Sequence, residues 1–381
     1  MLRWIAFALG VIVVSSTAVS VVGNLVVPRG ISSRVSRACD DVVDAALRLA
    51  TMRAESYQRR DRTLAWHAPA LLVLRLMTWL AMMYLGFGLM LMPFVRGVGR
   101  AFAQAGSSMF TLGYAGPSGS STTLVDYLAA FTGLIVVGLQ IGYLPTLYAA
   151  FNRRETEVTL LSSRAGLPAW GPELLARTRY GIFGEANAGE VMDELFTTWE
   201  RWAAEVAETH TTYLTLTRFR SPRPMSHWVT SLLAVMDAAA LHLSLAPSAP
   251  PGISARLCLR MGFVALRQIG RATGRGLVEE DPDPDAPLEL TYDEFESAVD
   301  MLRALKYPIE RTTAEAWPHF RGWRVNYEAA ALSLAKRVDA PPALWSGPRR
   351  WPSTPIAPIR PSNRLAKGAR PTVAPPPTEP A

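Results

Sequence analysis

Long uncharged runs of apolar residues alternate with arginine-rich segments in the first 152 residues of the chain. Residues 4–28 carry no charge, residues 64–94 contain only His67 and Arg75 as ionisable groups, and residues 127–152 are again uncharged. Because a helix rises about 1.5 Å per residue, each run is long enough to cross a hydrocarbon core of about 30 Å. The pattern predicts three membrane-spanning helices, the first within a segment of residues 1–28.

Arginines are distributed unevenly around these runs, and that asymmetry predicts an orientation. Residues 29–63, between the first two spans, carry eight arginines, and Arg153 and Arg154 follow the third span. Both segments are therefore expected on the cytoplasmic side of the plasma membrane. The N-terminus is then outside, and residues 95–126 face outward, although Arg3, Arg96 and Arg100 count against this orientation.

A helical period continues after residue 152 in a more charged sequence. Val191, Leu195 and Trp199 recur at the spacing of one helix face. Residues 228–245 are apolar enough to suggest a fourth span, but they are short and include Asp237, which favours a buried core helix. An all-helical cytoplasmic domain is expected over residues 153–339, with helices at residues 190–216, 228–245, 256–270, 292–305 and 326–338.

The segment of residues 340–381 has a different composition. Twelve prolines fall in the 41 residues from Pro341 onward, with basic side chains among them. Such a sequence buries too little apolar surface to offset the entropy of ordering it. A disordered basic tail is expected.

Three features of the membrane half have two interpretations each. Residues 1–28 are expected to be a retained helix, the alternative being a cleaved signal peptide, since Arg3 precedes the apolar run. In residues 29–63, a helix with Val43 and Leu47 on its apolar face lies either at the membrane interface or in solvent against the soluble domain. Arg75, near the inner end of its span, either extends to cytoplasmic headgroups or pairs with a pore element.

Composition excludes several classes of function. The chain carries 39 Lys and Arg against 32 Asp and Glu, but the arginines flank apolar runs, as in membrane proteins, and no nucleic-acid partner is expected. Cys39 and Cys258 are too few for a disulfide framework. The histidines lack metal-ligand spacing, and no set of nucleophile and base appears. No enzyme activity and no cofactor are expected.

Residues 107–116, between the second and third apolar runs, read as the end of a short helix and an extended loop. Residues 98–110 have the length of a short helix and follow Pro93 and Gly97. The next five residues can present a column of backbone carbonyl oxygens, which replace the hydration shell of a cation. They are Thr111, Leu112, Gly113, Tyr114 and Ala115.

This segment resembles the pore of the potassium-channel superfamily, whose filter reads Thr-Val-Gly-Tyr-Gly. The resemblance covers about residues 64–152 and implies an outer helix at 64–94, a pore helix at 98–110, a filter at 111–115 and an inner helix at 124–152. The expected fold is an all-α membrane protein with three transmembrane helices and a re-entrant pore helix and filter loop. Ser107 and Ser108 would support the pore helix, and K⁺ would bind the carbonyls of Thr111, Leu112, Gly113 and Tyr114. One chain supplies a quarter of such a path, so a homotetramer in the lipid bilayer is expected.

Two departures from the family pattern bear on selectivity. Ala115 replaces the second filter glycine, and a Cβ there is expected to be disfavoured by about 1–2 kcal/mol. Asp commonly follows the family filter, whereas Gly116 follows here. In the third span, Gly138, Gly142 and Pro145 are candidate gating hinges. Gly133 and Gly138 are candidates for either a hinge or close helix packing.

Two functions follow. The first is a homotetrameric cation channel, with potassium or another monovalent cation as the permeant ion. The alternative is a non-conducting, membrane-anchored interaction or signalling protein with a degenerate pore segment. The framework of Ser108, Thr111, Gly113 and Tyr114 favours the first function, and Ala115 favours the second.

Overall fold

The structure is a computed structural model that describes residues 1–27, 33–54, 56–116, 119–178, 188–274, 282–346 and 356–358. These residues form helices and no strands, apart from a bridge between Ala343 and Ile356. The chain divides into two compact units, Met1–Phe151 and Asn152–Ala381. Each unit is all-α, as the sequence pattern predicts.

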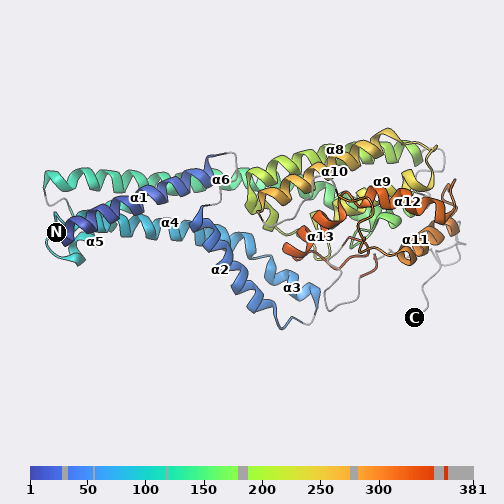
Figure 1. Cartoon of the computed structure of the whole chain (residues 1–381). Helices are drawn as coiled ribbons and strands as arrows, with labels where there is room; N and C mark the ends of the chain where they lie inside the picture. Colours follow the sequence, from blue (N-terminus) through green and yellow to red (C-terminus); the bar gives the residue numbers. More distant parts are fainter. Residues whose placement is uncertain are drawn as a thin grey trace, which may run out of the picture. The chain divides into compact units, whose positions relative to one another are not determined.

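The first unit is built from long apolar helices with shorter ones between them (Figure 1). Four helical stretches of the described chain are long and apolar enough to cross a membrane, namely Leu2–Leu25, Tyr57–Leu91, Ser120–Ala165 and Trp228–Leu245. They indicate a multi-pass membrane protein. The helices of the first unit are α1 (Leu2–Leu25), α2 (Arg34–Thr51), α3 (Tyr57–Leu64), α4 (His67–Leu91), α5 (Val98–Met109) and α6 (Ser120–Ala165), the last of which continues into the second unit.

Small residues bring α1 and α4 into close contact. A Cβ at Gly10 would lie 2.5 Å from the carbonyl oxygen of Gly86, so both helices need glycine at this crossing. Further along, the indole Nε1 of Trp79 donates to Ser20 Oγ at 3.1 Å. Trp79 also packs against Val136 of α6. The three long helices therefore share one buried contact.

The α2 helix packs on α4. Cys39 and Val43 bury their side chains against Leu71, so the apolar face expected at an interface or in solvent is covered by α4. The Arg75 guanidinium lies 2.5 Å from Asp40 of α2. Pairing of Arg75 with a pore element is not what the structure shows, because Asp40 belongs to α2. Extension of Arg75 to cytoplasmic headgroups stays a prediction.

The α6 helix is longer than the predicted inner helix of residues 124–152. It begins at Ser120 and ends at Ala165. Residues 153–165 include no glycine or proline, so the charges at Arg153 and Arg154 do not end the helix. It ends before Gly166, whose φ of +79° is the left-handed conformation typical of a helix C-terminus.

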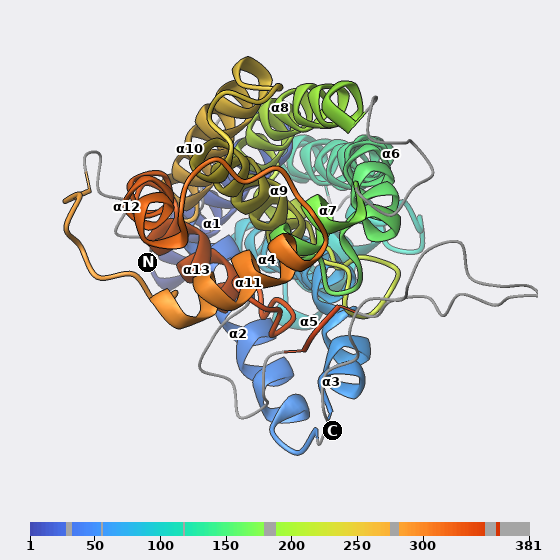
Figure 2. The same ribbon diagram turned by 90° about the vertical axis from the view of Figure 1, so that its right-hand side faces the viewer.

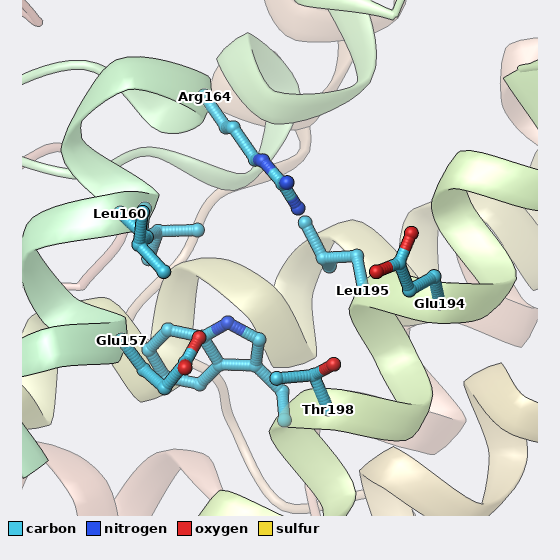
Figure 3. A pocket seen from close by; sticks show the side chains of 8 residues that line it. Glu157, Leu160, Arg164, Glu194, Leu195 and Thr198 are labelled. Atoms are coloured by element: carbon cyan, nitrogen blue, oxygen red, sulfur yellow. The ribbon is translucent and has the colours of Figure 1, made fainter. Parts of the chain in front are cut away.

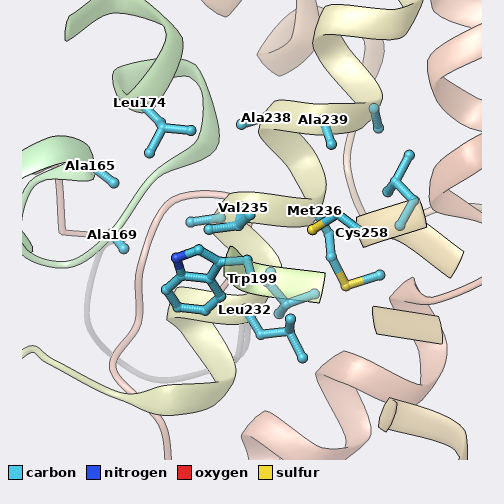
Figure 4. Close-up of a cluster of buried hydrophobic side chains, with 14 of the residues drawn as sticks. Ala165, Ala169, Leu174, Trp199, Leu232, Val235, Met236, Ala238, Ala239 and Cys258 are labelled. Atoms are coloured by element: carbon cyan, nitrogen blue, oxygen red, sulfur yellow. The ribbon is translucent and has the colours of Figure 1, made fainter. Parts of the chain in front are cut away.

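The second unit packs its helices around α9, Trp228–Leu245 (Figure 2). Every residue of α9 is buried. The surrounding elements are α7 (Gly171–Arg177), α8 (Ala188–Thr212), the 3₁₀ turn η2 (Leu214–Arg218), α10 (Ile253–Ala272), α11 (Tyr292–Ala304), α12 (Thr313–Arg324) and α13 (Glu328–Arg337). Figure 4 shows α9 side chains such as Leu232 and Val235 beside Trp199 of α8 and Cys258 of α10. This is the core helix that the sequence predicts at residues 228–245.

Buried charges join the elements of this unit. Arg154, 2% exposed, donates to the carbonyl oxygens of Leu216 and Phe219 and lies 2.7 Å from Glu155. Its Nη1 is 3.0 Å from His210 Nε2. Burial, and then the charge of Arg154, lower the pKa of His210 well below its usual value, so this imidazole is neutral in the folded chain.

A second buried network surrounds Asp237. Arg324 and Tyr327 each donate to Asp237 Oδ1 at 2.7 Å, and Arg324 also donates to Glu328 and to the carbonyl oxygen of Trp345. Trp345 is 3% exposed and belongs to the core. The expected tail boundary at residue 340 is therefore wrong, because residues 340–346 pack into the unit; residues 347–355 and 359–381 lie outside the described residues.

Candidate ion-conduction segment

The helix expected at residues 98–110 is α5, Val98–Met109. It follows Gly97, whose φ of +98° turns the chain back after α4. Ala101 and Ala105 are fully buried, and the ring of Phe102 meets Tyr84 of α4 edge to face at 5.5 Å. The buried alanines and this aromatic contact both place α5 against α4.

The C-terminal end of α5 lies against α6. A Cβ at Gly133 would overlap the carbonyl oxygen of Met109 and lie 3.2 Å from its carbonyl carbon. Ala129 and Val125, one and two turns earlier on α6, are buried in the same cluster as Met109. Of the two interpretations of Gly133, close packing is therefore the one that the structure supports.

After α5 the chain reverses and returns along its last turn. The amide of Leu112 donates to the carbonyl oxygen of Ser107 at 2.8 Å, and the amide of Ala115 donates to Ser107 Oγ at 3.0 Å. Thr111 and Gly113 have φ values of +54° and +72°. The amide of Thr111 also donates to the carbonyl oxygen of Ser108 at 3.1 Å. The loop is therefore held by Ser107 and Ser108 and shaped by two left-handed residues.

The strain expected at Ala115 does not arise in this chain. Ala115 is absent from the residues with positive φ, and the left-handed positions are Thr111 and Gly113. A Cβ costs little at a residue with ordinary φ. Leu112 and Tyr114, 64% and 66% exposed, face away from the unit.

The side chain of Ser108 binds a different element from that of Ser107. Its hydroxyl donates to Asp126 Oδ1 at 2.8 Å, and Gln104, one turn earlier, donates from Nε2 to Asp126 Oδ2 at 2.7 Å. Asp126 is 8% exposed. In the sequence it precedes the uncharged run of residues 127–152 and is the only acidic residue between Asp61 and Glu155.

The candidate hinges lie on an exposed face of α6. Gly138, Gly142 and Pro145 are exposed, and a Cβ at either glycine would have no atom within 4 Å. Within one chain, packing therefore requires glycine at neither position. Their role as hinges stays a prediction.

Other parts of the described chain offer little chemistry. A pocket of about 140 Å³ in the second unit lies between α6 and α8, with Glu157 and Arg164 on one side and Glu194 on the other (Figure 3). Ligand pockets are usually larger than about 300 Å³. Among the described residues, no group of three or more His, Cys, Asp and Glu side chains is placed to hold a metal ion.

Comparisons with known proteins identify no relative: no family model, curated protein or solved structure matches the chain.

Proposed function

We propose that the chain is a subunit of a homotetrameric cation channel, with potassium as the expected permeant ion. The observation that carries the proposal is the loop after α5, which reverses at Thr111 and Gly113 and is tied to the helix by Ser107. A short helix followed by such a loop, between two long apolar helices, is the arrangement that a carbonyl-lined filter needs.

The chemistry of the proposed path is passive. Carbonyl oxygens of residues 111–114, with the Thr111 hydroxyl, replace the hydration shell of the ion when four chains meet. The C-terminal end of α5 carries the negative end of the helix dipole, which favours a cation beside it. In the proposed assembly α4 is the outer helix, α6 is the inner helix and α1 is peripheral.

Flux into liposomes tests the proposal directly. Gly113→Ala is expected to abolish potassium flux while the purified protein keeps the mass of four chains. A Cβ at Gly113 would touch nothing within 4 Å, so its cost is the left-handed backbone alone, about 1–2 kcal/mol.

Gly116→Ala is the matched control. Gly116 also has open space around it but lacks a left-handed φ, so alanine is expected to leave flux unchanged. Ala115→Gly, which restores the second filter glycine, is expected to retain flux and to leave the preference for potassium over sodium unchanged, because Ala115 has an ordinary φ. Equal flux through Gly113→Ala and the parent would show that ions do not pass along residues 111–115.

The second candidate is a non-conducting interaction protein anchored in the membrane. Ala115 at a filter position favours it. The two functions separate in the same experiment, because a tetramer that is folded and silent in liposomes supports the second, and so does a strict monomer in several mild detergents.

A further inference from the structure

A buried carboxylate joins the proposed inner helix to the proposed pore helix. Asp126 lies in the second turn of α6, inside a run that otherwise has no acidic residue from 62 to 154. An ionisable side chain within an apolar span is costly and needs partners. Both of its carboxylate oxygens have one, from Ser108 and from Gln104.

The spacing of the two donors makes this contact sensitive to orientation. Gln104 and Ser108 are four residues apart, so both lie on the same face of α5. One carboxylate binds both, at 2.7 and 2.8 Å. Rotation of α5 about its axis would lengthen at least one of these bonds. Asp126 therefore fixes the rotation of α5 as well as its distance from α6.

The last turn of α5 connects Asp126 to the loop. Ser107 and Ser108 are neighbours that bond different elements: Ser108 bonds Asp126 of α6, and Ser107 bonds the loop amides of Leu112 and Ala115. Gly133, about two turns further along α6, meets the final carbonyl of α5. Two points of α6 thus hold the turn from which the loop begins.

We propose that Asp126 is a positioning residue for the filter-like loop, and that ion selectivity depends on its hydrogen bonds to Gln104 and Ser108. This inference rests on the proposed function. Asp126 itself touches no ion in this mechanism. It acts through α5, so a change in its hydrogen bonding alters the spacing of carbonyls about one turn away.

The experiment compares two variants of the same residue in the full-length protein. Asp126→Ala removes both acceptors, whereas Asp126→Asn is nearly isosteric and can still bond Ser108 and Gln104, since a hydroxyl and an amide can each donate or accept. We expect Asp126→Ala to lower the potassium-to-sodium permeability ratio by roughly tenfold, because hydrogen bonds to a charged group are among the stronger ones. Asp126→Asn is expected to stay within about threefold of the parent.

Thr123→Ala is the control on the same helix. Its hydroxyl donates to the carbonyl oxygen of Gly119, the residue just before α6, at 3.2 Å and not to α5. It should leave the permeability ratio unchanged. Ser108→Ala combined with Asp126→Ala should be less than additive, because both changes remove the same bond.

Hydrogen–deuterium exchange supplies a readout that needs no conduction. Peptides covering residues 107–116 are expected to exchange at least about tenfold faster in Asp126→Ala than in Thr123→Ala, since the turn that holds the loop amides loses its support. Unchanged exchange would overturn the inference whether or not the protein conducts.

The outcomes of the flux assay separate the two proposals. A folded parent that conducts nothing removes the proposed function and the selectivity role with it. A parent that conducts, with the same permeability ratio in Asp126→Ala, overturns only the inference. Equal losses in Asp126→Asn and Asp126→Ala would also overturn it, because they would assign the effect to the charge and not to the hydrogen bonds.

Discussion

The contact between α5 and α6 is expected to be least tolerant of added volume at Gly133. A Cβ there would overlap the carbonyl oxygen of Met109 and lie 3.1 Å from Met109 Cγ. Carbon atoms in contact prefer about 3.5–4.0 Å. The side chain can move aside, but the carbonyl is backbone at the end of a helix. Gly133→Ala must therefore push α6 and α5 apart by several tenths of an ångström or more.

The size of the effect follows from a matched pair. Overpacking costs about 1–3 kcal/mol, while Gly→Ala inside a helix gains up to about 1 kcal/mol. Gly138→Ala lies five residues further along the same helix with no atom within 4 Å, so it keeps the gain without the clash. The gain in helix propensity is the same in both variants, so it cancels when their free energies of unfolding are compared. Gly133→Ala should be less stable than Gly138→Ala by about 1–3 kcal/mol.

Unfolding in a mild detergent, followed by circular dichroism and by the fraction of assembled protein, measures this difference. Gly142→Ala is a second control, because it is equally open. If Gly133→Ala and both controls unfold at the same denaturant concentration, α6 does not approach α5 as described, and the packing argument fails. A hinge at Gly138 or Gly142 would appear differently, as altered flux in a variant of unchanged stability.

Other parts of the molecule give further predictions. Asp237→Ala leaves Arg324 buried without its closest carboxylate and should destabilise the folded chain by about 3–5 kcal/mol, measured by thermal unfolding. Burial lowers the pKa of His210 and of His227 well below 6.5. Below about pH 6.5 the unfolded chain therefore binds protons that the folded chain does not. The free energy of unfolding should decrease as the pH is lowered, by up to about 1.4 kcal/mol per pH unit for each histidine. Urea midpoints at pH 7.5 and 5.5 check this, and His210→Gln should make the stability less dependent on pH. Cysteines at exposed Ser121 and Ala45 should react with an impermeant reagent from opposite sides of the membrane, and labelling of both from outside would contradict the proposed orientation.

Cys39 cannot report the orientation, although its position between two spans suggests it. It is 4% exposed, and its thiol lies 3.6 Å from Thr78 Oγ1. A buried thiol reacts slowly from either side. Protection of Cys39 from a reagent would therefore reflect packing, and the engineered cysteines need a background in which it is replaced.

Hydrophobic periodicity predicts the helices well and their polar contacts poorly. The pattern places a helix at 228–245 and another at 98–110, and the structure has Trp228–Leu245 and Val98–Met109. Such signals are local, because one face of a helix repeats every three or four residues. The pattern misses α12, Thr313–Arg324, where Pro318 interrupts the signal, although a capping box of Thr312 and Glu315 marks the start of the helix.

Contacts between distant residues were not predictable in this way. Trp345 lies in a proline-rich stretch that predicts disorder, yet its carbonyl oxygen receives a hydrogen bond from Arg324. In the sequence, Asp126 is a charged residue just before an apolar run, which indicates a boundary between loop and helix. Its partners Gln104 and Ser108 follow only from the packing of α5 against α6. The lone acid among apolar residues was the available signal, since a buried charge requires donors nearby.

The exposure of each arginine decides whether its charge can influence the orientation of the chain in the membrane. Arg154 was counted as a charge beside the third span, but it is 2% exposed and bonded within the second unit, so it cannot face lipid headgroups. Arg34 and Arg48, by contrast, are exposed on α2, whose aspartates at 40 and 44 turn toward Arg75 and His67 of α4. The outward face of α2 is therefore more basic than the sequence composition of residues 29–63 suggests. Since positive charge near the span ends sets topology, the proposed cytoplasmic location rests on α2 and α3 and does not need Arg154.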